Sequence, residues 1–292
     1  MILTAFHGFC MALADSVPGV SGGTIAFILG FYERFLNALH DVFREKGQAR
    51  RAALVYLLKL GVGWVLGMGS CVVLLSNLFA QNIYFMSSLF LGLTVCSIPF
   101  VAAAEWQTLQ TSLRQSWFVL LGVALVVGLT LLRTGAGGFG SMDYAQLQPL
   151  QYVYIFLCGA AAITAMVLPG ISGSSILLIA GVYLPTIQAV HSLLKLQLAV
   201  FPGLCALGFG VLAGVAFSIS AIRAALQNHR GATVWLILGL MLGSLYAIAN
   251  GPASLDVPQP PLGAATFQPL AFVLGAAVLL ALEGMKKTAE KQ

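Results

Sequence analysis

Pro18-Gly19-Val20-Ser21-Gly22-Gly23-Thr24 is a polar break within a long apolar stretch, and the chain contains this break twice. The second copy, Pro169-Gly170-Ile171-Ser172-Gly173-Ser174-Ser175, begins 151 residues further on. The same offset relates Ile25 to Ile176, Gly30 to Gly181, Tyr32 to Tyr183, Ala38 to Ala189 and His40 to His191. Helix breakers and hydroxyl groups are unfavourable at membrane depth unless they line a cavity. A duplicated interruption therefore predicts a binding site of the kind found between the repeats of transporters.

The composition identifies the broad class of protein. Hydrophobic residues make up 59% of the chain and charged residues only 8%, whereas a soluble domain carries about 25% charged residues. The chain is therefore predicted to be an integral membrane protein. Its five cysteines lie in apolar segments without metal-ligand spacing, so we expect buried thiols. The sequence has no cofactor motif and no basic-aromatic patch, and it predicts neither a cofactor nor a nucleic-acid partner.

Six apolar runs are long enough to cross a bilayer, which takes about 20 helical residues. They cover residues 52–79, 83–104, 115–132, 199–223, 232–250 and 267–283. Two other regions, 3–40 and 152–194, are divided near the middle by the polar break. Each arm holds about 15 residues, or roughly 22 Å of helix. Each region is therefore either one long span or a re-entrant hairpin.

The distribution of Lys and Arg distinguishes these two topologies, because basic residues concentrate in cytoplasmic loops. If both broken regions are hairpins, ten basic residues share one side, and only Arg133 and Lys195 lie on the other. If both regions were full spans, the same twelve residues would divide six and six. The sequence therefore predicts re-entrant hairpins, with the N- and C-termini both in the cytoplasm.

The number of crossings then gives the fold class. Each half has one re-entrant helical hairpin plus three transmembrane helices, and because three is odd, the second half enters the membrane upside-down. We therefore predict an all-α integral membrane protein with an inverted-topology repeat. The single membrane domain 1–292 divides into repeat 1 (1–132), a linker (133–151), repeat 2 (152–284) and a polar tail (285–292). Gly92-Leu93 with Ser97 matches Gly239-Leu240 with Ser244 at an offset of 147, in agreement with this duplication.

The two breaks have the chemistry of an anion site. Hydroxyl side chains cap helix starts, free N–H groups and the positive end of the helix dipole attract anions, and glycine lets a phosphate approach the backbone. The predicted phosphate-binding residues are Ser21, Gly22, Gly23 and Thr24 in the first break and Ser172, Gly173, Ser174 and Ser175 in the second. The alternative is that both breaks are tight packing turns whose hydroxyls only cap helices.

Three charged residues near the first break are candidates for coupling or gating. Asp15 precedes the break, and it is either a proton carrier or a cap on local amides at the hairpin tip. Glu33 and Arg34 follow Tyr32, and we expect them to form a neutralised pair at the membrane surface, with a phosphate contact by Arg34 as the alternative. Lys59 lies inside a span and is expected to snorkel towards the surface or to bind a lipid phosphate.

Two other functions fit parts of the pattern. Gly19-Val20-Ser21-Gly22 matches the GxSG of intramembrane serine proteases, whose serine needs a histidine or acid within hydrogen-bond reach. The four histidines lie nearer to segment ends than to span centres, and a nucleophile gains nothing from an inverted duplicate, so we do not expect an enzyme. A transporter or channel for a small soluble anion could use the same two tips.

The paired motifs resemble those of the bacterial polyprenyl-phosphate transporter family, over nearly the whole chain. The family pattern is carried by Asp15, Pro18, Gly19, Ser21, Gly22, Gly23 and Thr24, and by Leu168 through Ser174. This resemblance implies a flippase for undecaprenyl phosphate, the lipid carrier of cell-wall sugars. It implies movement from the outer to the inner leaflet of the bacterial cytoplasmic membrane, for carrier recycling. The lipid and the direction follow from the resemblance and not from the charge pattern.

Overall fold

The described part of the chain is helical throughout. The computed structural model describes residues 2–15, 21–70, 82–135, 142–168, 170–254 and 259–289, and these ranges contain no strand. The expected all-α class is therefore confirmed. The first half contains α1 (Ile2–Asp15), α2 (Gly22–Ile28), α3 (Tyr32–Arg44), α4 (Gly47–Ser70), α6 (Ile83–Ala104), α7 (Trp106–Thr111) and α8 (Phe118–Gly135). The second contains α9 (Pro149–Val167), α10 (Gly173–Ile179), α11 (Tyr183–Leu194), α12 (Phe201–Asn228), α13 (Arg230–Ala249) and α14 (Pro269–Ala289).

Six helical segments are long and apolar enough to cross a membrane. They are 47–70, 83–104, 113–132, 149–167, 198–228 and 230–249. Five of them match predicted spans, and the sixth predicted span, 267–283, lies within the 21-residue helix α14. The remaining segment is α9, which has 19 residues where we expected a hairpin arm of about 15. Re-entry and inversion stay predictions, and residues 71–79 of the first predicted span fall outside the described ranges.

The two broken regions have the same local structure. Helices α2 and α10 have seven residues each and begin 151 positions apart. Each is followed by a glycine in the left-handed region, Gly30 at φ 73° and Gly181 at φ 70°. This conformation disfavours any residue with a Cβ. Tyr32 and Tyr183 then begin α3 and α11. The sequence repeat therefore specifies a repeated helix, turn and helix.

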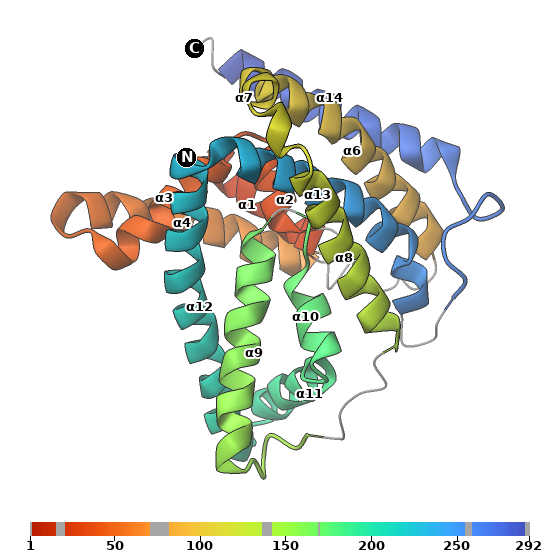
Figure 1. Cartoon of the computed structure of the whole chain (residues 1–292). Coiled ribbons are helices and arrows are strands. Elements are labelled where there is room, and N and C mark those ends of the chain that lie inside the picture. The colour runs from red at the N-terminus through yellow and green to blue at the C-terminus, as the bar shows by residue number, and fades with distance from the viewer. Residues whose placement is uncertain are drawn as a thin grey trace.

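Equivalent glycines bring equivalent helices into close contact. Helix α1 packs along α4, and α9 packs along α12 (Figure 1). Gly63 of α4 faces the carbonyl of Ala5 so closely that no Cβ would fit between them. Gly210 of α12 faces the carbonyl of Phe156 in the same way, at offsets of 147 and 151 from the first pair. Small residues at such contacts let membrane helices approach at short range.

The other major helix pairs join one half of the chain to the other. Helix α6 packs against α14, and α13 packs against α8. Gly92 meets the carbonyl of Phe272 in the first pair, and Gly239 meets the carbonyl of Val119 in the second. The matched Gly92 and Gly239 of the sequence are therefore packing positions. Each half supplies one helix to each of these two pairs, so the halves interlock.

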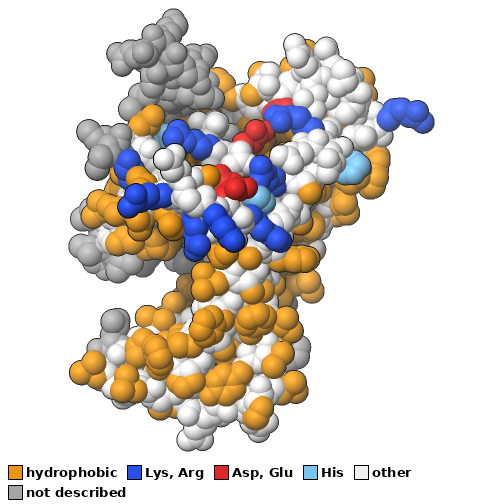
Figure 2. All heavy atoms as spheres, turned by 90° about the vertical axis from the view of Figure 1, so that its left-hand side faces the viewer, with side chains coloured by type: hydrophobic (Ala, Val, Ile, Leu, Met, Phe, Trp, Pro, Cys, Tyr) orange, Lys and Arg blue, Asp and Glu red, His pale blue; other side chains and the backbone are white. Residues whose placement is uncertain are grey.

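Large apolar side chains cover the outside of several helices. Leu58 of α4, Leu120 of α8, Phe217 of α12 and Leu270 of α14 are each between 66% and 79% exposed. Figure 2 shows such side chains over much of the lower half of one face. A soluble monomer rarely exposes apolar surface on this scale. These helices therefore present the surface that a multi-pass membrane protein turns towards lipid.

Candidate functional site

The two polar breaks are in direct contact. Ser21 Oγ donates to the carbonyl of Met166 at 3.0 Å, and Tyr32 Oη donates to the carbonyl of Val167 at 3.1 Å. In the other direction, the Gly170 N–H donates to Thr24 Oγ1 at 2.7 Å. The last carbonyls of a helix lack intrahelical partners, and here Ser21 and Tyr32 satisfy two of those of α9. We call this contact the junction: Ser21, Thr24 and Tyr32 on one side and Met166, Val167, Leu168 and Gly170 on the other.

The first break is tightly bonded within itself. Ser21 is the N-cap of α2, and its Oγ accepts from the Gly23 N–H at 3.1 Å. The Gly22 N–H donates to Asp15 Oδ1 at 2.7 Å. A Cβ on Gly22 would meet the Asp15 carboxylate, and one on Gly23 would stand 2.7 Å from the Val167 carbonyl oxygen. The glycines are therefore needed for close approach, and both of their amides already have a partner.

The second break has a different arrangement of polar groups. Ser172 begins α10 without a side-chain cap bond, and its Oγ lies 2.7 Å from Ser174 Oγ. Ser172 is buried and Ser174 is partly exposed. The Ser175 N–H donates to the Ser172 carbonyl at 3.1 Å, and Gly173 packs against Ala162 without room for a Cβ. The two hydroxyls thus bond to each other, and a ligand can replace that bond without breaking a helix cap.

Asp15 uses both of its carboxylate oxygens. Besides the Gly22 N–H on Oδ1, Trp64 Nε1 of α4 donates to Oδ2 at 2.9 Å. The alternative in which Asp15 caps a local amide is therefore present in the structure, at Gly22 of the first break. Trp64 lies in a run of apolar residues, and nothing in the sequence connects it with Asp15. In the second break, Met166 stands at the equivalent position, so this cap exists once.

Asp15→Asn should reduce stability through Trp64. The asparagine carbonyl can keep the bond from Gly22, but its NH₂ group then faces the Trp64 N–H, and two donors oppose each other. We expect a loss of about 1–2 kcal/mol in the free energy of unfolding. Thermal melts in detergent would measure it, with Trp64→Phe as the second arm of a double-mutant cycle. Additive losses in the double variant would contradict this account.

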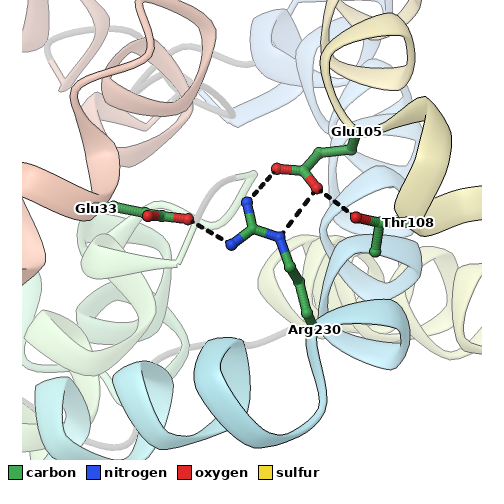
Figure 3. A network of polar contacts seen from close by, with 4 residues as sticks. All are labelled: Glu33, Glu105, Thr108 and Arg230. Atoms are coloured by element: carbon green, nitrogen blue, oxygen red, sulfur yellow. Dashed lines mark hydrogen bonds and ion pairs between the residues drawn. The ribbon is translucent and has the colours of Figure 1, made fainter.

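Glu33 belongs to an ion-pair network that joins three parts of the fold (Figure 3). Arg230, the first residue of α13, contacts Glu33 of α3 at 3.0 Å through Nη1. The same guanidinium binds Glu105, between α6 and α7, through Nη2 at 2.5 Å and Nε at 3.1 Å. Thr108 Oγ1 donates to Glu105 Oε2 at 2.9 Å. The partner of Glu33 is therefore Arg230, from the other half of the chain, and not the adjacent Arg34.

Arg34 makes a different contact. Its guanidinium carbon lies 4.8 Å from the centroid of the Tyr56 ring on α4, a cation–π geometry. Within the described ranges, Arg34 belongs neither to the ion-pair network nor to the hydrogen bonds of the junction. The three charged candidates near the first break therefore lie in three separate environments: Asp15 bonds to Gly22 and Trp64, Glu33 belongs to the ion-pair network, and Arg34 lies over the Tyr56 ring.

An apolar pocket of about 560 Å³ adjoins the junction. Its walls come from α8, α9, α10 and α12 and include Leu168, which precedes the second break, and Ile171, which lies within it. Leu125 and Phe217 also line it, and they are 41% and 79% exposed on the outer, apolar surface. The apolar pocket therefore connects the neighbourhood of the polar junction with the surface that lipid would cover.

The architecture defines a multi-pass helical membrane protein with a polar junction beside an apolar pocket. The family described as VCA0040-like, undecaprenyl phosphate translocase-like, matches residues 11–265, and the chain belongs to this family. A protein of Staphylococcus aureus named polyprenyl-phosphate transporter is 34% identical over 249 residues, which cover 85% of this chain and 86% of that protein. A protein of Vibrio cholerae with the same name is 32% identical over 257 residues, or 83% of this chain and 75% of that protein. No solved structure matches the chain.

The family resemblance based on the two motifs is therefore confirmed, and the chain is a membrane transporter of this family. Both relatives carry the name of a transporter and not of an enzyme. In the described ranges, the bonds of the Ser21 and Ser172 hydroxyls go to backbone groups and to Ser174. The described residues also include no group of three or more His, Cys, Asp or Glu that could hold a metal ion.

Proposed function

We propose that this chain transports undecaprenyl phosphate, or a closely similar polyprenyl phosphate, from the outer to the inner leaflet of the bacterial cytoplasmic membrane. Such transport would recycle the carrier lipid for cell-wall synthesis. The observation that carries this proposal is the position of Leu168, which lines the apolar pocket and whose carbonyl accepts a bond from Ser21 in the junction. A lipid phosphate needs polar donors for its headgroup next to an apolar path for its chain. The names of the two relatives support the same substrate.

In this proposal the headgroup binds between the two breaks, at the junction and the adjacent hydroxyls of the second break. Ser172 and Ser174 offer two hydroxyl donors once the bond between them is exchanged for phosphate oxygens, with Gly173 and Ser175 beside them. On the other side are Ser21, Gly22, Gly23 and Thr24, whose polar groups bond within the protein in the present structure. Charge-assisted hydrogen bonds to phosphate are stronger than these neutral ones. Binding would therefore open the junction by replacing its bonds.

The proposed movement is a rocking of one repeat against the other. The Lys and Arg distribution supports re-entrant hairpins and an inverted repeat, with both termini cytoplasmic. The equivalent glycine contacts of α1 with α4 and of α9 with α12 support two similar rigid units. The ion-pair network of Glu33, Arg230 and Glu105 would hold one conformation and break in the other. Asp15 or Glu33 would couple the movement to a proton.

Transport in proteoliposomes tests this function. Labelled undecaprenyl phosphate would be reconstituted with the protein, and an external, membrane-impermeant phosphatase would report how fast inner-leaflet headgroups become accessible. We expect the Ser172→Ala/Ser174→Ala variant to be slower by about tenfold or more, since two donors to a buried phosphate are lost. Ser220→Ala, which removes a hydroxyl bonded within α12, is the matched control.

Two results would contradict the proposal. Wild-type rates in the Ser172→Ala/Ser174→Ala variant would exclude the second break as the headgroup site. Uptake of a soluble anion such as phosphate, without any movement of the lipid, would replace the lipid by the small-anion alternative.

A further inference from the structure

A second pocket, of about 490 Å³, lies between α1, α3 and α4 and is rich in positive charge. Arg34 of α3 and Arg51 and Lys59 of α4 line it, together with the neutral polar side chains of Thr4 and Gln48. We call it the basic pocket. Figure 2 shows Lys and Arg side chains gathered in a band across one face of the molecule, above its apolar lower half. The basic pocket shares no lining residue with the apolar pocket beside the junction.

No carboxylate in the described part of the chain forms an ion pair with the cations of the basic pocket. Within the described ranges, the ion pairs closer than 4.0 Å involve His40 and Arg230 as the cations. None of them includes Arg34, Arg51 or Lys59. Glu33, the carboxylate adjacent to Arg34 in the sequence, is bound by Arg230 instead. Three cations that face one pocket without a carboxylate repel one another, and an anion between them would relieve that repulsion.

Tyr56 supplies an independent observation. It lines the basic pocket, it is only 9% exposed, and its buried hydroxyl has no hydrogen-bond partner among the described residues. A buried hydroxyl without a partner is unfavourable. A ligand oxygen that reached it from the pocket would accept a hydrogen bond from it. The Tyr56 ring also lies under the guanidinium of Arg34, which fixes that donor at the pocket.

The position of the pocket favours an anion that belongs to a lipid. Arg51, Val55 and Lys59 follow one another at every fourth residue and therefore share one face of α4, about 12 Å long. Val55 is 45% exposed, and the neighbouring Leu58 is 66% exposed. Lys59 is half-buried inside this membrane-spanning segment. Cations beside exposed apolar side chains on a spanning helix match a headgroup whose chains enter the bilayer.

We propose that the basic pocket is a binding site for the phosphomonoester headgroup of a lipid, separate from the junction. Arg34 of α3 and Arg51 of α4 donate to the phosphate oxygens, Lys59 adds a third positive charge, and Tyr56 Oη donates a further bond. The site does not depend on headgroup binding at the junction. The same four donors suit inorganic phosphate, so the test separates the two sources.

Lipid binding to the full-length protein in neutral phosphatidylcholine nanodiscs tests the site. The probe is dioleoyl phosphatidic acid, a lipid phosphomonoester, titrated with and without millimolar inorganic phosphate. We expect Arg51→Gln/Lys59→Gln to weaken binding about tenfold or more, and Tyr56→Phe to weaken it by a few-fold, because each change removes donors to a charged ligand. Arg50→Gln is the matched control, because Arg50 has the same charge on the same helix turn but does not line the pocket.

The binding results distinguish a lipid site from a free-anion site and from the absence of a site. Loss of binding in Arg51→Gln/Lys59→Gln but not in Arg50→Gln supports the site, and failure of inorganic phosphate to compete assigns it to the lipid. Competition by phosphate would assign it to the free anion. Equal binding by all four proteins would overturn the site. Ser172→Ala/Ser174→Ala, tested in parallel, should bind phosphatidic acid at the basic pocket like the wild type, so a failure of the transport proposal would leave this result intact.

Discussion

Replacing Gly63 or Gly210 with alanine is expected to destabilise the protein strongly, and by a similar amount at the two positions. Each glycine faces a backbone carbonyl of the partner helix, that of Ala5 or Phe156, with no space for a Cβ. Backbone atoms cannot move aside as a flexible side chain can, so the helices must separate along the whole contact. Overpacking of this kind costs about 1–3 kcal/mol, and we expect values at or above the upper end. Thermal unfolding in detergent would measure the loss.

The chain provides matched controls one half-turn away. Gly61 and Gly208 lie two residues before Gly63 and Gly210 on the same helices, and a Cβ at either would meet nothing within 4 Å. Gly61→Ala and Gly208→Ala should therefore leave stability unchanged or raise it slightly, because alanine favours a helix more than glycine. Equal effects at all four positions, or destabilisation at only one of the two contacts, would contradict the equivalent packing of the two halves.

The second large loss of stability is expected from Arg230→Gln. This change leaves the carboxylates of Glu33 and Glu105 close together without the guanidinium that bridges them. The Glu105 side chain is only 16% exposed and is bound through two nitrogens, whereas Glu33 is 57% exposed and bound through one. Bidentate pairs are the stronger kind, but solvent screens an exposed one. We expect a loss of about 1–3 kcal/mol in the free energy of unfolding, most of it through Glu105.

A double-mutant cycle separates the two contacts. Glu105→Gln should be clearly coupled to Arg230→Gln, and Glu33→Gln only weakly, with both energies falling at high salt. Arg114→Gln is the control for loss of one exposed positive charge, since the described ion pairs do not include Arg114. If Arg230→Gln melted at the temperature of Arg114→Gln, the network would have no structural role.

Local patterns in the sequence predict much of this fold. The composition predicts the class, and the register of the two breaks predicts that α2 and α10, and the starts of α3 and α11, are equivalent. The offset in the sequence identifies Gly92 and Gly239 as equivalent. Only the structure shows that Gly92 contacts α14 and Gly239 contacts α8. Helix α9 has 19 residues and is longer than the expected arm of about 15, because it begins at Pro149, before the predicted start at residue 152.

The polar partners could not be predicted, because they join residues that are far apart in the chain. Tyr32 bonds to Val167 over 135 positions, and Arg230 binds Glu105 over 125. Trp64 looks like any other aromatic residue of a membrane span until α1 and α4 come together around Asp15. The repeat itself also hides a difference. The two motifs are nearly identical in sequence. In the first break, however, the serine hydroxyl caps the following helix, whereas in the second break two serine hydroxyls bond to each other.

The crossed pairing of α6 with α14 and of α8 with α13 has a consequence for biosynthesis. Helix α6 ends at Ala104, and its packing partner α14 begins only at Pro269. During translation, the glycine surface of α6 must therefore remain against lipid or an insertion factor until the last helix has left the ribosome. The surface of α8 that packs against α13 must likewise remain uncovered until α13 has been synthesised. The protein cannot be completed one half after the other, and a truncated chain that ends before α14 would present the insertion machinery with an unfinished bundle.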